Sequence, residues 1–290
     1  MKVFSKKIVV AIVILAVFAV GISVFFVFRN NKPEPVPEVV SKLNPEKKII
    51  GKSVQGREIE SYTYGGGDTH IVFVGGMHGG YEWNSVLLAY QFIDYLKANP
   101  NVIPENLTIT VIPSANPDGV YKVIGKEGRF AIADVPAGIA EAPGRFNANT
   151  VDLNRNFDCK WQATSTWQNK LESAGTAPFS EPEAKAIRDF VLKNKPAAVI
   201  FWHSKSNAVY ASECKKGILP ETLNIMNIYS KASGYPAVKS FDSYVVTGDA
   251  EGWLASINIP AITVELQTHE TVEWNRNLAG ALAIFKYFGI

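Results

Sequence analysis

The strongest constraint on the fold is a short apolar run that ends in glycines and a histidine. Residues 71–74 are β-branched or aromatic, which predicts a buried strand. Two glycines break the run, His78 follows, and apolar residues then recur at helical spacing from Glu82 to Leu96. A histidine after a strand and a carboxylate at the start of a helix suit a catalytic zinc ion, which needs few ligands and one open position. A surface histidine beside a helix-starting glutamate would give the same pattern.

The charge of the chain is nearly balanced, with 29 Lys and Arg residues against 27 Asp and Glu residues. The basic residues are spread thinly, whereas a nucleic-acid-binding domain needs a basic face. We therefore expect no nucleic-acid partner.

The two cysteines, Cys159 and Cys214, lack the close pairwise spacing of a zinc-ribbon site. They are either two buried thiols or, if the domain lies outside the cytoplasm, one disulfide. The N-terminal segment favours the disulfide.

This N-terminal segment predicts attachment to a membrane. Residues 1–7 are rich in lysine, and residues 8–28 are uncharged and apolar. A helix of that length rises roughly 30 Å, so it predicts a transmembrane helix or an uncleaved signal anchor. The denser basic cluster precedes it, which favours a cytoplasmic N-terminus and an extracytoplasmic domain; cleavage would give a secreted protein. Residues 29–45 contain several prolines and predict a semi-rigid tether before a domain that covers residues 46–290.

Strands and helices are predicted to alternate through that domain. The expected strands cover residues 71–74, 107–113, 197–202 and 259–266, and the expected helices cover residues 82–96, 181–194 with Ser180 as its cap, 219–233 and 272–287. This alternation predicts an α/β fold with a mixed, largely parallel sheet flanked by helices. Between the second and third strands, residues 116–119 predict a turn and residues 120–150 predict a long functional loop.

Three expected strands end in or carry side chains that can bind or activate a ligand: His78, His203 and Glu265. Ligands of open α/β sheets bind beyond the carboxyl ends of the strands, so we expect these residues to converge. Arg145 and the pair Asn154–Arg155 lie in or beside the loops that would cover that edge.

From about Ser41 onward, the chain resembles the zinc carboxypeptidases, the family typified by pancreatic carboxypeptidase A, and is similar to its shorter bacterial members. The ordered set of motifs is more specific than any one of them. The matching segments are His78…Glu82, Asn116–Gly119, Asp152–Phe157, His203–Ser204, Tyr244–Gly248 and Thr263–Leu266.

The resemblance implies one zinc ion per chain, with His78, Glu82 and His203 as its ligands and water in the open position. Asp152 would accept a hydrogen bond from the outer ring nitrogen of His78. The remaining histidines, at positions 70 and 269, match no ligand of the family.

The resemblance also implies the catalytic groups. Glu265 would be the general base that takes the proton of the attacking water and later gives it to the leaving amine. Arg145 would polarise the scissile carbonyl and stabilise the oxyanion. Arg129 is the alternative for that role.

The substrate implied is a peptide with a free C-terminal carboxylate. Asn154 and Arg155 would hold this carboxylate, because a guanidinium fork fits it bidentately, and Tyr244 would close over the substrate. Alignment on the Tyr244 motif places Glu251 at the base of the side-chain pocket. Glu251, assisted by Asp249, would favour a cationic C-terminal residue; both acids could instead simply be exposed.

Two departures from the family pattern bear on these roles. Three residues, Gly79–Tyr81, separate His78 from Glu82, whereas two are usual in the family. With the usual spacing, the position of the carboxylate ligand would fall on Tyr81. We keep Glu82 as the ligand because the glycine pair can absorb an extra residue and because Trp83 follows it. Lys205 stands two residues after His203, where a tyrosine is usual in carboxypeptidase A-like members.

The sequence thus predicts a membrane-tethered, extracytoplasmic zinc metallocarboxypeptidase. The alternative is an enzyme that acts on cell-wall murein peptides near diaminopimelate. A hypothesis from another class is a catalytically inactive module that binds C-termini, which the irregular spacing between His78 and Glu82 would support.

Overall fold

The computed structural model describes residues 44–137, 142–241 and 244–289. These residues belong to one unit, residues 42–290. The expected membrane segment, residues 8–28, and nearly all of the expected tether lie outside the described residues. Within the described ranges, no helix is both long and apolar enough to cross a bilayer.

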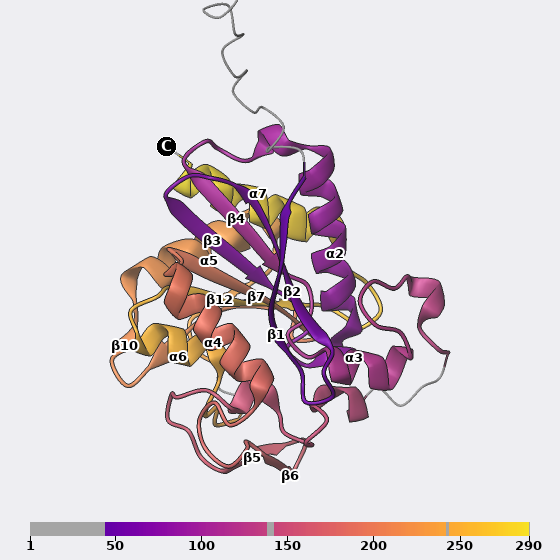
Figure 1. Ribbon diagram of the computed structural model, residues 1–290. Helices are drawn as coiled ribbons and strands as arrows, with labels where there is room; N and C mark the ends of the chain where they lie inside the picture. Colours follow the sequence, from indigo (N-terminus) through magenta and orange to yellow (C-terminus); the bar gives the residue numbers. More distant parts are fainter. Residues whose placement is uncertain (1–43, 138–141, 242–243, 290) are drawn as a thin grey trace, which may run out of the picture. The chain divides into compact units, whose positions relative to one another are not determined.

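A mixed sheet of eight strands forms the centre of this unit, in the order β1-β2-β4-β3-β7-β12-β8-β11 (Figure 1). The strands are β1 (Glu46–Lys52), β2 (Glu58–Gly65), β3 (Thr69–Val74), β4 (Leu107–Ile112), β7 (Ala198–Ser204), β8 (Ala208–Ala211), β11 (Ala237–Val238) and β12 (Ala261–Leu266). The four central strands, β4, β3, β7 and β12, run parallel, whereas β2 and β8 pair antiparallel to them. The predicted mixed α/β sheet is therefore confirmed.

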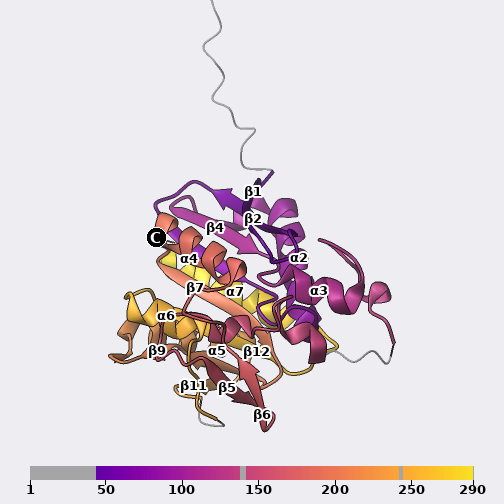
Figure 2. The same ribbon diagram turned by 60° about the horizontal axis from the view of Figure 1, so that its bottom comes forward.

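Helices cover both faces of the sheet, and two small hairpins lie outside it (Figures 1 and 2). The helices are α2 (Trp83–Ala98), α3 (Pro117–Ile124), α4 (Pro182–Asn194), α5 (Pro220–Ser233), α6 (Ala250–Ser256) and α7 (Trp274–Phe288). The short 3-10 turns are η2 (Gly79–Glu82), η3 (Pro100–Val102), η4 (Ile132–Asp134), η5 (Ala142–Arg145) and η6 (Leu153–Arg155). The hairpins pair β5 (Thr164–Trp167) with β6 (Lys170–Ser173) and β9 (Glu213–Cys214) with β10 (Gly217–Ile218).

Alternation along β3 explains the two layers of the core. Ile71 and Phe73 belong to the core under α2, α5 and α7, whereas Val72 and Val74 belong to the core under α4 and α6. Successive side chains of a strand point to opposite faces, so a strand covered on both faces must be apolar throughout. All residues of β7 are likewise buried. This double burial fixes the strand ends, and hence the residues that follow them.

The segment after β4 differs from the prediction. Asn116–Gly119 does not form an isolated turn but begins α3: Asn116 caps the helix by accepting a hydrogen bond from the Gly119 N–H (2.9 Å), and Pro117 occupies the first helical position. Gly125, with φ +74°, ends the helix in the left-handed region. Only the rest of the expected loop is largely irregular. The prediction was wrong because the same residue types favour turns and helix starts.

One disulfide, Cys159–Cys214, joins the segment after η6 to β9, with the two Cα atoms 6.0 Å apart. It confirms the disulfide and excludes the alternative of two buried thiols. The cross-link encloses a sequence separation of 55 residues. Since Cys159 closely follows η6, the disulfide ties a loop of the expected substrate site to the β9–β10 hairpin.

We predict that replacing both cysteines by serine lowers the free energy of unfolding by about 4 kcal/mol, because a loop of this length gains much entropy in the uncross-linked unfolded chain. Denaturant unfolding of the oxidised protein and of the double variant measures the difference. Reductant should destabilise the wild type and leave the variant unchanged. Equal midpoints for the two oxidised proteins would contradict the prediction.

Candidate active site

Two parallel neighbouring strands deliver the central histidines. His78 follows β3 and His203 lies near the end of β7, and β3 pairs with β7. Glu82 ends η2 and caps α2. The extra residue before Glu82 is accommodated in η2, where Gly79 has φ +46° and a Cβ would lie 2.7 Å from the Gly144 carbonyl oxygen. Only glycine fits at this position. Its conformation makes the turn tight enough to bring Glu82 back to the histidines.

The three predicted ligands meet in one buried cluster. Glu82 Oε1 lies 2.7 Å from His78 Nδ1, and Glu82 Oε2 lies 2.9 Å from His203 Nδ1. The two Nδ1 atoms are 3.2 Å apart. One ligand atom from each residue falls within 4.8 Å of the others, and the residues are 6%, 2% and 1% exposed for His78, Glu82 and His203. The ring of Tyr81 instead packs on His269, with centroids 4.6 Å apart.

This cluster has the donor set and geometry of a cation site. Two imidazole nitrogens and a carboxylate oxygen are typical ligands of catalytic zinc. Glu82 Oε2 is buried, and its 2.9 Å ion-pair contact with His203 Nδ1 is not a hydrogen bond, so a cation bound there would supply the missing partner. Burial opposes ionisation, yet the charges of the two histidines hold the pKa of Glu82 below its ordinary value. The residues therefore fit a zinc ion.

Each imidazole has a carboxylate at its outer nitrogen. His78 Nε2 lies 3.3 Å from Asp152 Oδ1 and His203 Nε2 lies 3.3 Å from Glu251 Oε1, both as ion-pair contacts; the hydrogen bond expected between His78 and Asp152 stays a prediction. Glu251 Oε1 also accepts a hydrogen bond from Thr263 Oγ1 (3.1 Å). Carboxylates in this position fix the ring orientation of metal ligands and raise their basicity. The contact of Glu251 with His203 was not anticipated from the sequence.

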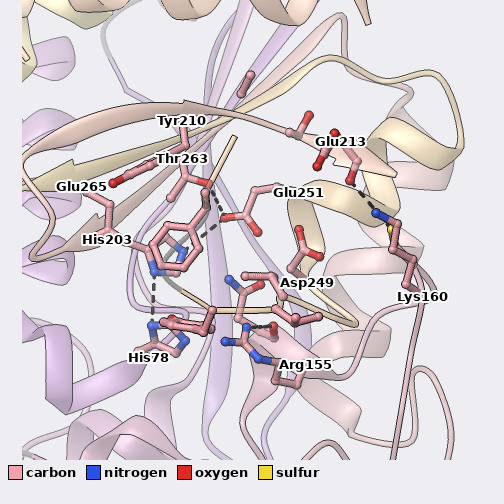
Figure 3. A pocket seen from close by; sticks show the side chains of 18 residues that line it. His78, Arg155, Lys160, His203, Tyr210, Glu213, Asp249, Glu251, Thr263 and Glu265 are labelled. Carbon is pink, nitrogen blue, oxygen red and sulfur yellow. Dashed lines mark hydrogen bonds and ion pairs between the residues drawn. The ribbon is translucent and has the colours of Figure 1, made fainter. Parts of the chain in front are cut away.

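A cavity of about 460 Å³ opens beside the cluster (Figure 3). The predicted residues that line it are His78, Asn154, Arg155, His203, Tyr244, Asp249, Glu251 and Glu265. Figure 3 shows Glu265 beside His203, in keeping with their paired positions on β12 and β7, and Arg155 on another side of the cavity. Tyr244 is 40% exposed. One cavity thus contacts both the metal cluster and the expected carboxylate site.

Glu265 is a buried acid with a strongly perturbed ionisation. Burial and then the charge of Glu82 raise the pKa of Glu265 to about 7, against the opposing effect of the histidines. The Ser206 N–H donates to Glu265 Oε2 (3.2 Å). A carboxyl group that titrates near neutrality can both accept and return a proton.

Asn154 and Arg155 are held rigidly in η6. Asn154 Oδ1 accepts a hydrogen bond from the Ala250 N–H (2.9 Å) at the start of α6. Arg155 donates through Nε to Ser165 Oγ (3.0 Å) and through Nη1 to the Asn154 carbonyl (2.7 Å). The Tyr244 ring centroid lies 5.8 Å from the Arg155 guanidinium carbon. These contacts point a fixed amide and a fixed guanidinium at the cavity.

The structure separates the two candidate arginines. Arg145 is buried and its Nη2 lies 2.5 Å from Asp152 Oδ2, so Asp152 contacts both Arg145 and His78. Arg145 is not among the described residues that line the cavity, and the Trp167 ring centroid lies 4.7 Å from its guanidinium carbon. Arg129 instead pairs with Asp94 on α2, at the surface. Arg145 is therefore the one connected to the metal cluster.

Sequence reasoning missed Glu172, on β6. Its carboxylate oxygens lie 3.5 Å from Nε of Arg145 and 3.5 Å from Nε of Arg155. No motif identified it, because a lone glutamate in a short polar hairpin has no distinctive pattern. Alternation along the hairpin would have been the available signal, since Glu172 is the buried residue of β6.

Residues 43–275 match the family model described as zinc carboxypeptidase. Among curated proteins, gamma-D-glutamyl-L-diamino acid endopeptidase 1 of Lysinibacillus sphaericus is 27% identical over 238 residues, covering 75% of this chain and 59% of that protein. Murein peptide amidase A of Escherichia coli K12 is 30% identical over 149 residues, covering 48% of this chain and 58% of that protein. The chain thus spans about three fifths of these relatives.

Solved structures share the fold at low sequence identity. Bovine thrombin-activatable fibrinolysis inhibitor, in complex with tick carboxypeptidase inhibitor, superposes with a TM-score of 0.67 at 21% identity and covers 84% of this chain and 88% of its own. The murein-tripeptide amidase of Escherichia coli O157 gives a TM-score of 0.60 at 21% identity and covers 85% and 94%. Both show the same arrangement of sheet and helices.

We predict that the Glu82→Gln variant loses stoichiometric zinc, whereas Tyr81→Phe retains it, because Glu82 alone of the two contributes an oxygen to the cluster. Loss of a supporting carboxylate typically weakens metal binding about 10- to 100-fold, and loss of a ligand should exceed that. Metal analysis after dialysis and competition with a chelator measure the affinities. Equal zinc content in Glu82→Gln and the wild type would exclude Glu82 as a ligand.

Proposed function

The chain belongs to the zinc carboxypeptidase family, and from this premise we propose that it hydrolyses the C-terminal peptide bond of peptides. The observation that carries the proposal is the single cavity that joins His78, His203 and Glu265 to Asn154 and Arg155. A site for a free carboxylate in the same cavity as a metal site supports cleavage of the last peptide bond, because the substrate would be held by its C-terminus.

In this proposal, Asn154 and Arg155 bind the terminal carboxylate. The guanidinium can donate in parallel to both carboxylate oxygens, which fixes the orientation as well as the charge of the substrate. Asn154 Oδ1 is already bonded to the Ala250 N–H, so its amide N–H groups are the ones presented to an acceptor. Tyr244, at the mouth of the cavity, covers the bound residue.

The chemical step uses Glu265, Arg145 and the three metal ligands. When bound by His78, Glu82 and His203, one zinc ion per chain supplies a Lewis acid that activates water. Glu265 accepts the proton of the attacking water and then donates it to the leaving amine. Arg145 does not line the cavity, so in this proposal its charge, which also acts on Glu82, would stabilise negative charge at the scissile carbonyl from outside the cavity lining. Asp152 holds both His78 and Arg145 in place.

The acids of the cavity support a preference for cationic C-terminal residues. Glu251 and Asp249 both line it. Burial opposes ionisation of Glu251, but its contacts with His203 keep its pKa below the ordinary value, so it is a carboxylate at neutral pH. Burial and the charge of Glu251 raise the pKa of Asp249 to about 6. A lysine, arginine or diaminopimelate side chain would bring the compensating positive charge.

A second candidate is hydrolysis of murein peptides near diaminopimelate. Two relatives, one named gamma-D-glutamyl-L-diamino acid endopeptidase 1 and the other murein peptide amidase A, favour it. The inactive binding module is the weakest hypothesis, because carboxylate capture has no use for a buried acid such as Glu265. We further propose that residues 8–28 anchor the enzyme with its catalytic domain extracytoplasmic, or secreted after cleavage, which agrees with the disulfide.

We predict that Glu265→Gln lowers kcat by about 10²- to 10⁴-fold and leaves zinc content unchanged, because the amide cannot accept the proton. The wild-type kcat/KM should fall on the acid side as Glu265 is protonated. This limb should lie at or below pH 7, since a bound cation favours the carboxylate over the raised pKa of about 7. Exposed Glu270→Gln is the control, and similar kcat values for both variants would contradict the assignment.

We predict that peptides ending in lysine are cleaved faster than peptides ending in leucine, and that amidated peptides react at least about 10-fold more slowly because a charge-assisted hydrogen bond is lost. Glu251→Gln should reduce the preference for lysine about 10-fold. Amino-acid release from matched peptides and from murein tripeptides measures all three. Cleavage of murein fragments alone would select the second candidate.

A further inference from the structure

The β5–β6 hairpin presents two side chains to the arginines of the site. Ser165 and Glu172 are directly paired across the hairpin, so both side chains lie on the same face. They are the buried residues of their strands, whereas the neighbouring Leu171 is exposed. The Asp152 N–H donates to the Ser173 carbonyl (3.0 Å) and joins the hairpin to the segment that carries Arg155.

Glu172 completes a buried cluster of four charges. Its Oε2 lies 3.5 Å from Arg145 Nε and its Oε1 lies 3.5 Å from Arg155 Nε, while Asp152 Oδ2 lies 2.5 Å from Arg145 Nη2. The four residues are all buried. Neither oxygen of Glu172 has a hydrogen-bond partner in the described part of the chain. A buried carboxylate without a direct hydrogen bond is costly, so its contribution to stability does not explain its position.

The proposed function brings a third anion to this cluster. The terminal carboxylate of a peptide binds at Arg155. Glu172 already offsets part of the positive charge of both Arg155 and Arg145. The two guanidinium groups would then face three buried carboxylates, those of Asp152, Glu172 and the substrate, and this excess of negative charge opposes ionisation of all three. Either the substrate binds weakly or one of the anions becomes neutral.

We propose that Glu172 is a positioning residue that serves as the resident counter-ion of Arg145 and Arg155 and takes up a proton when the carboxylate of a substrate replaces it. The inference rests on the proposed carboxylate site. In the free protein the ionised side chain holds both guanidinium groups in place from the hairpin side. In the complex the carboxyl group of Glu172 is neutral, so the substrate carboxylate offsets the positive charge of Arg145 and Arg155 in its place.

The ionisation of Glu172 agrees with this exchange. The charged groups that face it are Asp152, Arg145 of η5 and Arg155 of η6. Burial and then the charge of Asp152 raise the pKa of Glu172 to about 7, although the arginines lower it. A further anion raises that pKa again, so binding draws a proton from solution. Carboxylate affinity should therefore be constant well below pH 7 and fall by up to about tenfold per pH unit above it.

The test is calorimetric titration of the zinc-loaded full chain with N-acetyl-L-lysine, in two buffers of different ionisation enthalpy at pH 7.5. We expect uptake of a large fraction of one proton by the wild type and close to none by Glu172→Gln. The affinity of this variant should also depend less on pH above 7 than that of the wild type, and the remaining dependence belongs to Glu265 and Asp249. N-acetyl-L-lysinamide, which lacks the carboxylate, should cause no uptake linked to Glu172.

Glu183→Gln is the matched control, because Glu183 is also buried with a pKa raised by burial, but it bonds to Val54 and Asn147 instead of the arginines. Equal proton uptake by the wild type and Glu172→Gln would overturn the inference. So would the absence of uptake in the wild type, a result that does not depend on the variant folding. If N-acetyl-L-lysine does not bind to the wild type at all, the proposed function fails together with the inference. If it binds without proton uptake, only the inference fails.

Discussion

A carboxylate buried between two imidazoles is the interaction on which the rest of the site depends. Glu82 contacts His78 and His203 through different oxygens: Oε1 is hydrogen-bonded to His78 Nδ1, whereas Oε2 has no hydrogen-bond partner among the described residues and is the atom most in need of a cation. The pairing of β3 with β7 sets the separation of the histidines, and the glycines of η2 allow the carboxylate to reach both. The geometry of the sheet thus produces a metal site before any metal binds.

Carboxylates around that cluster organise the remaining groups. Asp152 lies against both His78 and Arg145, so one acid orients a metal ligand and a cation expected to act on the substrate. Glu172 continues the chain of charges to Arg155. Since every charged group here is buried, a change at one alters the ionisation of the next, and binding, metal affinity and pH dependence should be coupled.

Several elements were predictable because their residues act locally. The apolar runs of β3 and β7, buried on both faces, identified the central strands, and the motifs identified the cluster of His78, Glu82 and His203. The start of α3 at Asn116 was missed because the same dipeptides serve turns and helix caps. Glu172 and the contact of Glu251 with His203 were missed because each depends on partners far away in the sequence.

The sequence by itself determined the alternation of strands and helices, the residue types at the strand ends and the family to which the chain belongs, because periodicity and ordered motifs are properties of the chain alone. Only the tertiary structure decided which carboxylate faces which cation. Strand order, the tight turn of η2 and the docking of the β5–β6 hairpin bring together residues that no spacing relates, and electrostatic interactions depend on distance and burial in space.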